Sequence, residues 1–133
     1  MIEWDSSLET GEKQVDSQHR AMVETVGRLM EACSAEKGAG QAEEVLVFLI
    51  DYTKRHFSDE ESLMKKAKYP GYAEHKKLHS NFKKQELREL KELWQRTGPS
   101  KEFLMALNTK LAVWLCTHIK SADKEFVRYY KAR

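Results

Sequence analysis

Apolar residues recur every three or four positions along most of the chain, which is the period of an amphipathic helix and not of a strand. Four stretches follow this period, at about residues 16–37, 41–66, 72–96 and 100–130. Residues 1–14 show no clear period and predict an ordered N-terminal arm. Glycine and proline are scarce, with six and two residues, which leaves few turns and favours a handful of long helices.

The connections between these stretches are short, so consecutive helices are expected to be antiparallel neighbours. Tyr69-Pro70-Gly71 ends the second stretch, because proline lacks a backbone donor and disfavours helix at the residue before it. Thr97-Gly98-Pro99 makes the next turn, and Ser100 is the expected N-cap of the fourth helix. The pattern predicts an all-α single domain over residues 1–133, an antiparallel up-down-up-down four-helix bundle with an N-terminal arm.

The third stretch has the weakest apolar stripe of the four. Polar residues at positions 85, 86 and 89 interrupt it in the middle. We still expect one inward face on this helix. Its members are His75, Leu78, His79, Phe82, Leu90 and Leu93.

Composition and charge exclude several classes of function. The chain is 41% hydrophobic and 33% charged, and its formal charge of +2 is spread with mixed signs, so no footprint for nucleic acid is visible. The longest apolar run, residues 45–50, is far too short to cross a membrane. No secretory signal is visible, so we expect a cytoplasmic location, reduced cysteines and, from the Lys- and Glu-rich helix exteriors, a monomer. No CxxC motif occurs, which argues against a thiolate metal site.

The histidines occupy unusual positions for a plain bundle. All five, His19, His56, His75, His79 and His118, lie on the apolar stripes and none lies on a polar face. A buried imidazole without partners costs roughly 1–3 kcal/mol for each unpaired polar group. A metal-free structural bundle is therefore the least favoured interpretation.

The spacing of these residues indicates ligands that converge. Glu60 follows His56 by four positions, and His79 follows His75 by four, so each pair lies on one helix face. His19 lies near the start of the first helix, and His118 and Asp123 lie near the end of the fourth. In an antiparallel bundle all seven residues then lie at the same height.

Seven ligands exceed the four that a tetrahedral zinc site takes, so they predict a pair of octahedral ions. Imidazole with carboxylate favours iron, although manganese, zinc or cobalt could also bind. Two bridging carboxylates, five imidazoles and one solvent-derived bridge leave one position open, where a small ligand such as dioxygen could bind. The sequence has no Glu-x-x-His motif of the carboxylate-rich di-iron oxygenases, so binding without O–O cleavage is expected.

One step in the motif does not suit a regular helix. Asp123 follows His118 by five positions, about 140° from alignment at 100° per residue. We therefore predict a departure from α geometry between them, either a π-bulge or a carboxylate that reaches across. Glu61, about 100° around the helix from Glu60, is expected to face solvent, and Cys116 is expected to face away from the metals.

The chain strongly resembles the hemerythrin family, and within it the single-domain bacteriohemerythrins. The resemblance covers nearly the whole chain, and the early Trp4 also fits it. Four segments carry it: residues 15–19 (VDSQH), 56–64 (HFSDEESLM), 75–79 (HKKLH) and 114–123 (WLCTHIKSAD).

The resemblance implies two iron ions joined by an oxo or hydroxo bridge and by two carboxylates. It assigns His75, His79 and His118 to the saturated iron, His19 and His56 to the iron with the open position, and Glu60 and Asp123 to the bridges.

The resemblance also implies an apolar pocket for oxygen beside the open position. Its lining would be Met22, Phe57, Trp114, Leu115 and Ile119, and plain core packing is the alternative interpretation of these residues.

The function expected from these observations is reversible dioxygen binding by a carrier, store or delivery protein that is not an enzyme. An oxygen-consuming enzyme is a possible recipient. Two alternatives stay open: an oxygen-sensing or redox-sensing domain, and detoxification of peroxide or nitric oxide at the same di-iron centre. Turnover of peroxide, compared with stable oxygenation, would separate them.

Overall fold

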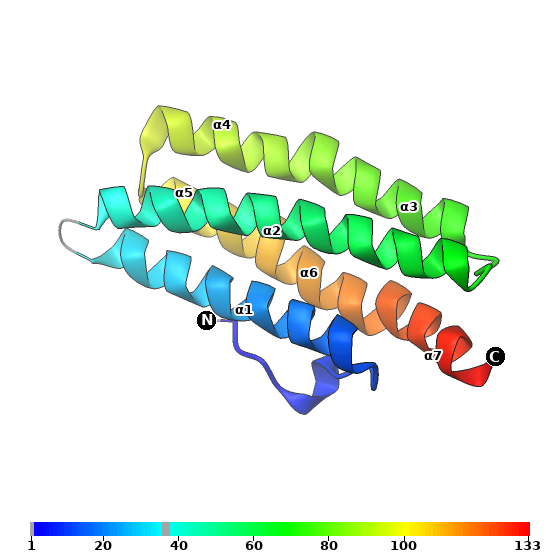
Figure 1. Cartoon of the computed structure of the whole chain (residues 1–133). Helices are drawn as coiled ribbons and strands as arrows, with labels where there is room; N and C mark the ends of the chain where they lie inside the picture. The colour runs from blue at the N-terminus through cyan, green and yellow to red at the C-terminus, as the bar shows by residue number, and fades with distance from the viewer. Residues whose placement is uncertain (1, 36–37) are drawn as a thin grey trace.

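A computed structural model describes residues 2–35 and 38–133, and its helices lie along four roughly parallel axes (Figure 1). The first two axes are single helices, α1 (Lys13–Ser34) and α2 (Ala39–Lys66). The arm that precedes α1 holds one short 3₁₀ turn, η1 (Ser6–Leu8), and lies beside the bundle. The described residues contain no strand.

The third and fourth axes are each one long helix interrupted by wider π turns. The third runs through α3 (Tyr72–Asn81), the π segment η2 (Phe82–Leu87) and α4 (Arg88–Thr97). The fourth runs through α5 (Lys101–Ala106), η3 (Leu107–Ala112), α6 (Val113–His118), η4 (Ile119–Asp123) and α7 (Lys124–Ala132). The four axes alternate in direction, so the predicted all-α antiparallel bundle is confirmed.

The helix ends differ from the predicted ones by a few residues. Helix α1 begins at Lys13 rather than 16 because the Glu12 carboxylate caps it, accepting from the amide of Val15 at 2.6 Å. The predicted end of this helix at 37 lies outside the described residues. Ser100 caps α5 as predicted, since its hydroxyl oxygen accepts from the amide of Phe103 at 3.0 Å.

The π segment η2 explains the weak stripe of the third helix. Phe82 and Leu87 are five positions apart, yet both are buried, because a π turn spans about one more residue than an α turn. The polar residues that interrupt the pattern lie within or just after this wide turn. The prediction that Leu78 faces inward was wrong: it is 44% exposed. It lies about 60° from the direction shared by His75, His79 and Phe82 at 100° per residue.

Apolar side chains close the bundle on both sides of the histidines. The larger cluster fills the end that carries the α1–α2 and α4–α5 turns, with Leu29, Leu49 and Leu107 fully buried. A smaller one, built on Val15 and Phe126, fills the opposite end. The polar residues between them are thereby separated from bulk water. Among the described residues, no helix is both long and apolar enough to cross a membrane.

Candidate metal centre

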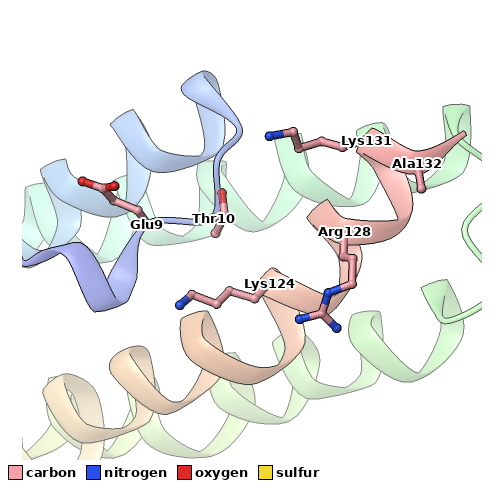
Figure 2. Close-up of a pocket in the computed structure, with 6 residues that line it drawn as sticks. All are labelled: Glu9, Thr10, Lys124, Arg128, Lys131 and Ala132. Carbon is pink, nitrogen blue, oxygen red and sulfur yellow. The ribbon is translucent and has the colours of Figure 1, made fainter.

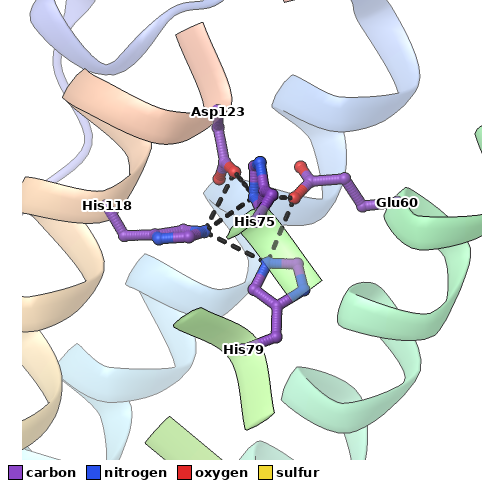
Figure 3. A group of neighbouring side chains, drawn as sticks. All are labelled: Glu60, His75, His79, His118 and Asp123. Atoms are coloured by element: carbon purple, nitrogen blue, oxygen red, sulfur yellow. Dashed lines mark hydrogen bonds and ion pairs between the residues drawn. The ribbon is translucent and has the colours of Figure 1, made fainter. Parts of the chain in front are cut away.

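All seven predicted ligands meet at one point between the helices, and none is more than 5% exposed. Five of them, with their contacts, are drawn in Figure 3. The four helical axes each contribute at least one, and the side chains divide into two overlapping groups. These groups are Glu60, His75, His79, His118 and Asp123, and His19, His56, Glu60 and Asp123.

The first group has the geometry of ligands around one octahedral ion. The Nε2 atom of His118 lies 3.1 Å from the Nε2 atoms of both His75 and His79. Asp123 Oδ1 lies 2.9 Å from His75 Nε2 and 3.0 Å from His118 Nε2, and Glu60 Oε1 lies 2.9 Å from His75 Nε2. Adjacent ligands of an octahedral ion with bonds of about 2.1 Å are roughly 3 Å apart. The five distances are therefore those expected between adjacent ligands of one such ion.

The second group uses the remaining carboxylate oxygens. Asp123 Oδ2 lies 2.8 Å from His19 Nε2, and Glu60 Oε2 lies 3.7 Å from His56 Nε2 and 3.9 Å from His19 Nε2. Each carboxylate thus gives one oxygen to the three-histidine group and the other to the two-histidine group. This division is what two carboxylates do when they bridge two metal ions.

Several of these buried atoms have no hydrogen-bond partner. They are Nε2 of His19 and of His56 and all four carboxylate oxygens of Glu60 and Asp123. These atoms lie close together and point toward the same space between the helices, but they are poorly aligned for hydrogen bonds to one another. Because buried polar groups are almost always satisfied, this donor set fits metal ions better than a network of hydrogen bonds.

The pKa values show how the two buried carboxylates are balanced by protons. Burial alone would lower the pKa of His75, but the nearby Asp123 and Glu60 outweigh it and raise it to about 9. The same carboxylates raise the pKa of His19 against burial. Burial lowers the pKa of His56 to about 4. Burial would raise the pKa of Asp123, but the surrounding imidazoles bring it well below its ordinary value. Divalent cations would replace these protons as counter-charge.

Two residues outside the ligand set hold imidazoles from behind. Gln18 Oε1 accepts from Nδ1 of His56 at 2.7 Å, and its Nε2 donates to Asp59 at 3.0 Å. Glu61 accepts from Nδ1 of His79 at 2.8 Å. Such partners set which ring nitrogen is free to bind a metal.

The expectation that Glu61 faces solvent was wrong, since its side chain is only 16% exposed. A rotation of 100° from Glu60 points it toward α3, where His79 offers a donor. The sequence predicted no role for Gln18, because the imidazole that it supports, His56, lies 38 residues away on another helix.

Asp123 reaches the centre through a π turn. The segment η4 covers Ile119–Asp123, so a residue five positions after His118 shares its face, and the predicted departure from α geometry is confirmed. Asp123 is 1% exposed, while Ala122, the residue aligned in a regular helix, is partly exposed.

The residues expected to line an oxygen pocket fall into two sets. Met22, Leu115 and Ile119 are buried in one apolar cluster beside the arm. Phe57 packs on an imidazole of the three-histidine group, and Trp114 does so while also packing against this cluster. The Trp114 ring stacks on His118 at 4.5 Å, and the Phe57 ring stacks on His79 at 3.9 Å. The role of all five residues as an oxygen pocket stays a prediction.

A separate hollow of about 410 Å³ lies on the surface between the arm and α7 (Figure 2). Lys124, Arg128 and Lys131 line it, together with Glu9 and Thr10. Three cations and one carboxylate would repel a metal ion. The buried cluster is therefore the candidate metal site.

Comparison with known protein families shows which family this chain belongs to. The family described as "Hemerythrin HHE cation binding domain" matches residues 10–130. The chain belongs to the hemerythrin family. Members of this family bind iron and dioxygen at a di-iron centre, and the cluster described above could hold a metal.

Individual hemerythrins are similar to the chain over most of its length. A bacteriohemerythrin of Stenotrophomonas maltophilia (strain R551-3) is 32% identical over 132 residues, covering 99% of this chain and 83% of the relative. A bacteriohemerythrin of Pseudomonas aeruginosa (strain UCBPP-PA14) is 35% identical over 124 residues, covering 93% and 78%. A myohemerythrin of Riftia pachyptila is 29% identical over 123 residues, covering 92% and 88%.

Proposed function

We propose that this hemerythrin binds dioxygen reversibly at two iron ions and acts as an oxygen carrier, store or delivery protein. His75, His79 and His118 would hold one ion, His19 and His56 would hold the other, and Glu60 and Asp123 would bridge them. The observation that carries the proposal is the division of each carboxylate between the two groups of imidazoles.

The unequal groups support an open position on one side. Five protein atoms surround the three-histidine position and four surround the two-histidine position. A solvent-derived oxo or hydroxo bridge would raise these numbers to six and five. An octahedral ion takes six ligands, so the two-histidine position is one ligand short. When bound, ferrous iron supplies the electrons that dioxygen needs to bind.

The side chains of this protein favour binding over further reaction. Buried apolar residues on both sides of the ligands, among them Met22 and Ile119, exclude bulk water from the centre. Excluding water limits the delivery of protons, and without protons the bound dioxygen is less readily released in a reduced form such as peroxide. Five neutral imidazoles against two carboxylates also stabilise high-valent iron less than a carboxylate-rich site does. Release of unchanged dioxygen is therefore expected.

A spectroscopic cycle tests the proposal. The chain is loaded with ferrous iron without oxygen, the iron content is measured, and oxygen is admitted and then removed. We expect two irons per chain and a visible charge-transfer band that appears with oxygen and disappears on its removal. The Glu44→Gln variant, changed at an exposed position of α2, should behave like the wild type.

The His56→Ala variant should lose the band, because it removes an imidazole from the side with the open position. Rapid irreversible oxidation of the wild type, or steady consumption of added peroxide, would refute the carrier function. The first result would favour a sensor, and the second would favour an enzyme.

A further inference from the structure

We propose that Glu61 is a positioning residue that acts through His79 and makes the three-histidine position bind its metal ion more tightly than the two-histidine position does. The inference rests on the two-metal site of the proposed function and not on its oxygen binding. It assigns a role to a residue outside the seven ligands.

The contact between the two residues is close and sheltered. Glu61 Oε2 lies 2.8 Å from Nδ1 of His79, and the carboxylate side chain is 16% exposed while the imidazole is fully buried. Among the described residues, His79 is the only group that lies within ion-pair distance of Glu61. No lysine or arginine of the described residues therefore competes with His79 for this carboxylate.

The other end of the centre has a different partner. Nδ1 of His56 donates to Gln18, whose amide oxygen is neutral, and the amide group in turn donates to Asp59. The two metal positions are thus supported from behind by groups of unlike charge. The three-histidine position has a carboxylate behind it, and the two-histidine position has an amide.

This difference changes the strength of the imidazole as a ligand. A hydrogen bond from an N–H to a carboxylate is roughly twice as strong as one to a neutral acceptor. By drawing the Nδ1 proton away, it increases the electron density on Nε2, the atom that faces the centre. An imidazole held in this way is a better ligand, and losing such a partner typically costs about 10–100-fold in metal affinity.

Packing allows charge to be tested apart from orientation. The Phe57 ring lies parallel to the His79 ring at 3.9 Å and restrains its rotation. In the Glu61→Gln variant the amide oxygen can still accept from Nδ1, so the ring keeps its place while the negative charge is lost. The Glu61→Ala variant removes the acceptor altogether.

The test is a titration of the metal-free chain with Co²⁺ in competition with a chelator, which gives two stepwise binding constants. Glu61→Gln should weaken the tighter step about 10-fold and Glu61→Ala up to about 100-fold, with the weaker step unchanged. Gln18→Ala should weaken the other step instead. Glu44→Gln, which also removes one negative charge from α2, should change neither. Far-UV circular dichroism of each metal-free variant checks that it is folded.

The inference is overturned if Glu61→Gln leaves both constants unchanged or weakens both equally, since an equal loss would reflect net charge alone. It also fails if Gln18→Ala weakens the same step as Glu61→Gln. Co²⁺ binding does not depend on oxygen chemistry. A wild type that binds two Co²⁺ ions but shows no reversible oxygenation with iron would refute the proposed function and leave this inference standing.

Discussion

Removing the metal is expected to destabilise the bundle strongly. Six ligand atoms, on His19, His56, Glu60 and Asp123, are buried and have no hydrogen-bond partner. In the loaded protein each would be satisfied by an ion. In the metal-free protein each atom has lost its hydrogen bonds to water and gained no partner, which lowers the stability of the folded state.

The structure allows this cost to be estimated. A buried polar group without a partner costs about 1–3 kcal/mol, so six such groups cost roughly 6–18 kcal/mol. Protons on His75 and His19 and water that enters the site would recover much of this. If about a third remains, the loss is about 2–6 kcal/mol, against a total stability of about 5–15 kcal/mol for a typical domain. For a chain of this size that corresponds to a fall in Tm of roughly 7–20 °C.

The assay is thermal unfolding followed by circular dichroism, on the same preparation before and after chelation and again after metal is restored. Co²⁺ serves as the added metal because it does not oxidise in air as ferrous iron does. The Glu44→Gln variant should show the same difference as the wild type, since its side chain is exposed and lies twelve residues before His56 on α2. A chelated chain that melts within about 2 °C of the loaded chain would refute the argument that these atoms need cations.

Three further changes have definite expected results. Ser100→Ala should lower the free energy of unfolding by about 1 kcal/mol in urea, because it removes the cap of α5. Moving the carboxylate back one residue, with Ala122→Asp and Asp123→Ala together, should reduce the metal content below two ions per chain by elemental analysis, because the π turn directs position 123 inward. The stability of the metal-free chain should be greatest near pH 6.5. Below that pH stability falls, because His56 takes up a proton in the unfolded chain but not in the folded one, where its pKa is about 4. Above that pH stability also falls, because the His75 cation that stabilises the folded chain loses its proton as the pH approaches its pKa of about 9. Urea titrations across pH 4–9 would contradict this if stability rose steadily in either direction.

Helical periodicity alone was enough to predict the bundle. An apolar stripe with a period of 3.6 residues specifies a helix, and short turns at Pro70 and Pro99 leave antiparallel packing as the simple arrangement. The types of ligand were also visible in the sequence. Histidines on an apolar stripe are costly without partners, and a spacing of four places His75 and His79 on one face.

The π turns were only partly predictable. The five-residue step from His118 to Asp123 indicated one of them, because the motif required both side chains on one face. The turn at Phe82–Leu87 appeared in the sequence only as a weakened stripe, and the inward assignment of Leu78 failed beside it. A π turn depends on packing against neighbouring helices, which a single-helix pattern does not contain.

The residues behind the imidazoles were decided by tertiary structure. Glu61 looks like an exposed acid when its own helix is considered alone, and its burial follows from the position of His79 on another helix, 18 residues away. Gln18 and His56 are likewise 38 residues apart. The sequence by itself predicted the helices and the seven candidate ligands, because the apolar period and the four-residue spacings lie within single helices, and Asp123 alone departed from that spacing. How the carboxylate oxygens are divided, and which group supports which imidazole, depend on distances between helices, and only the packed bundle sets those.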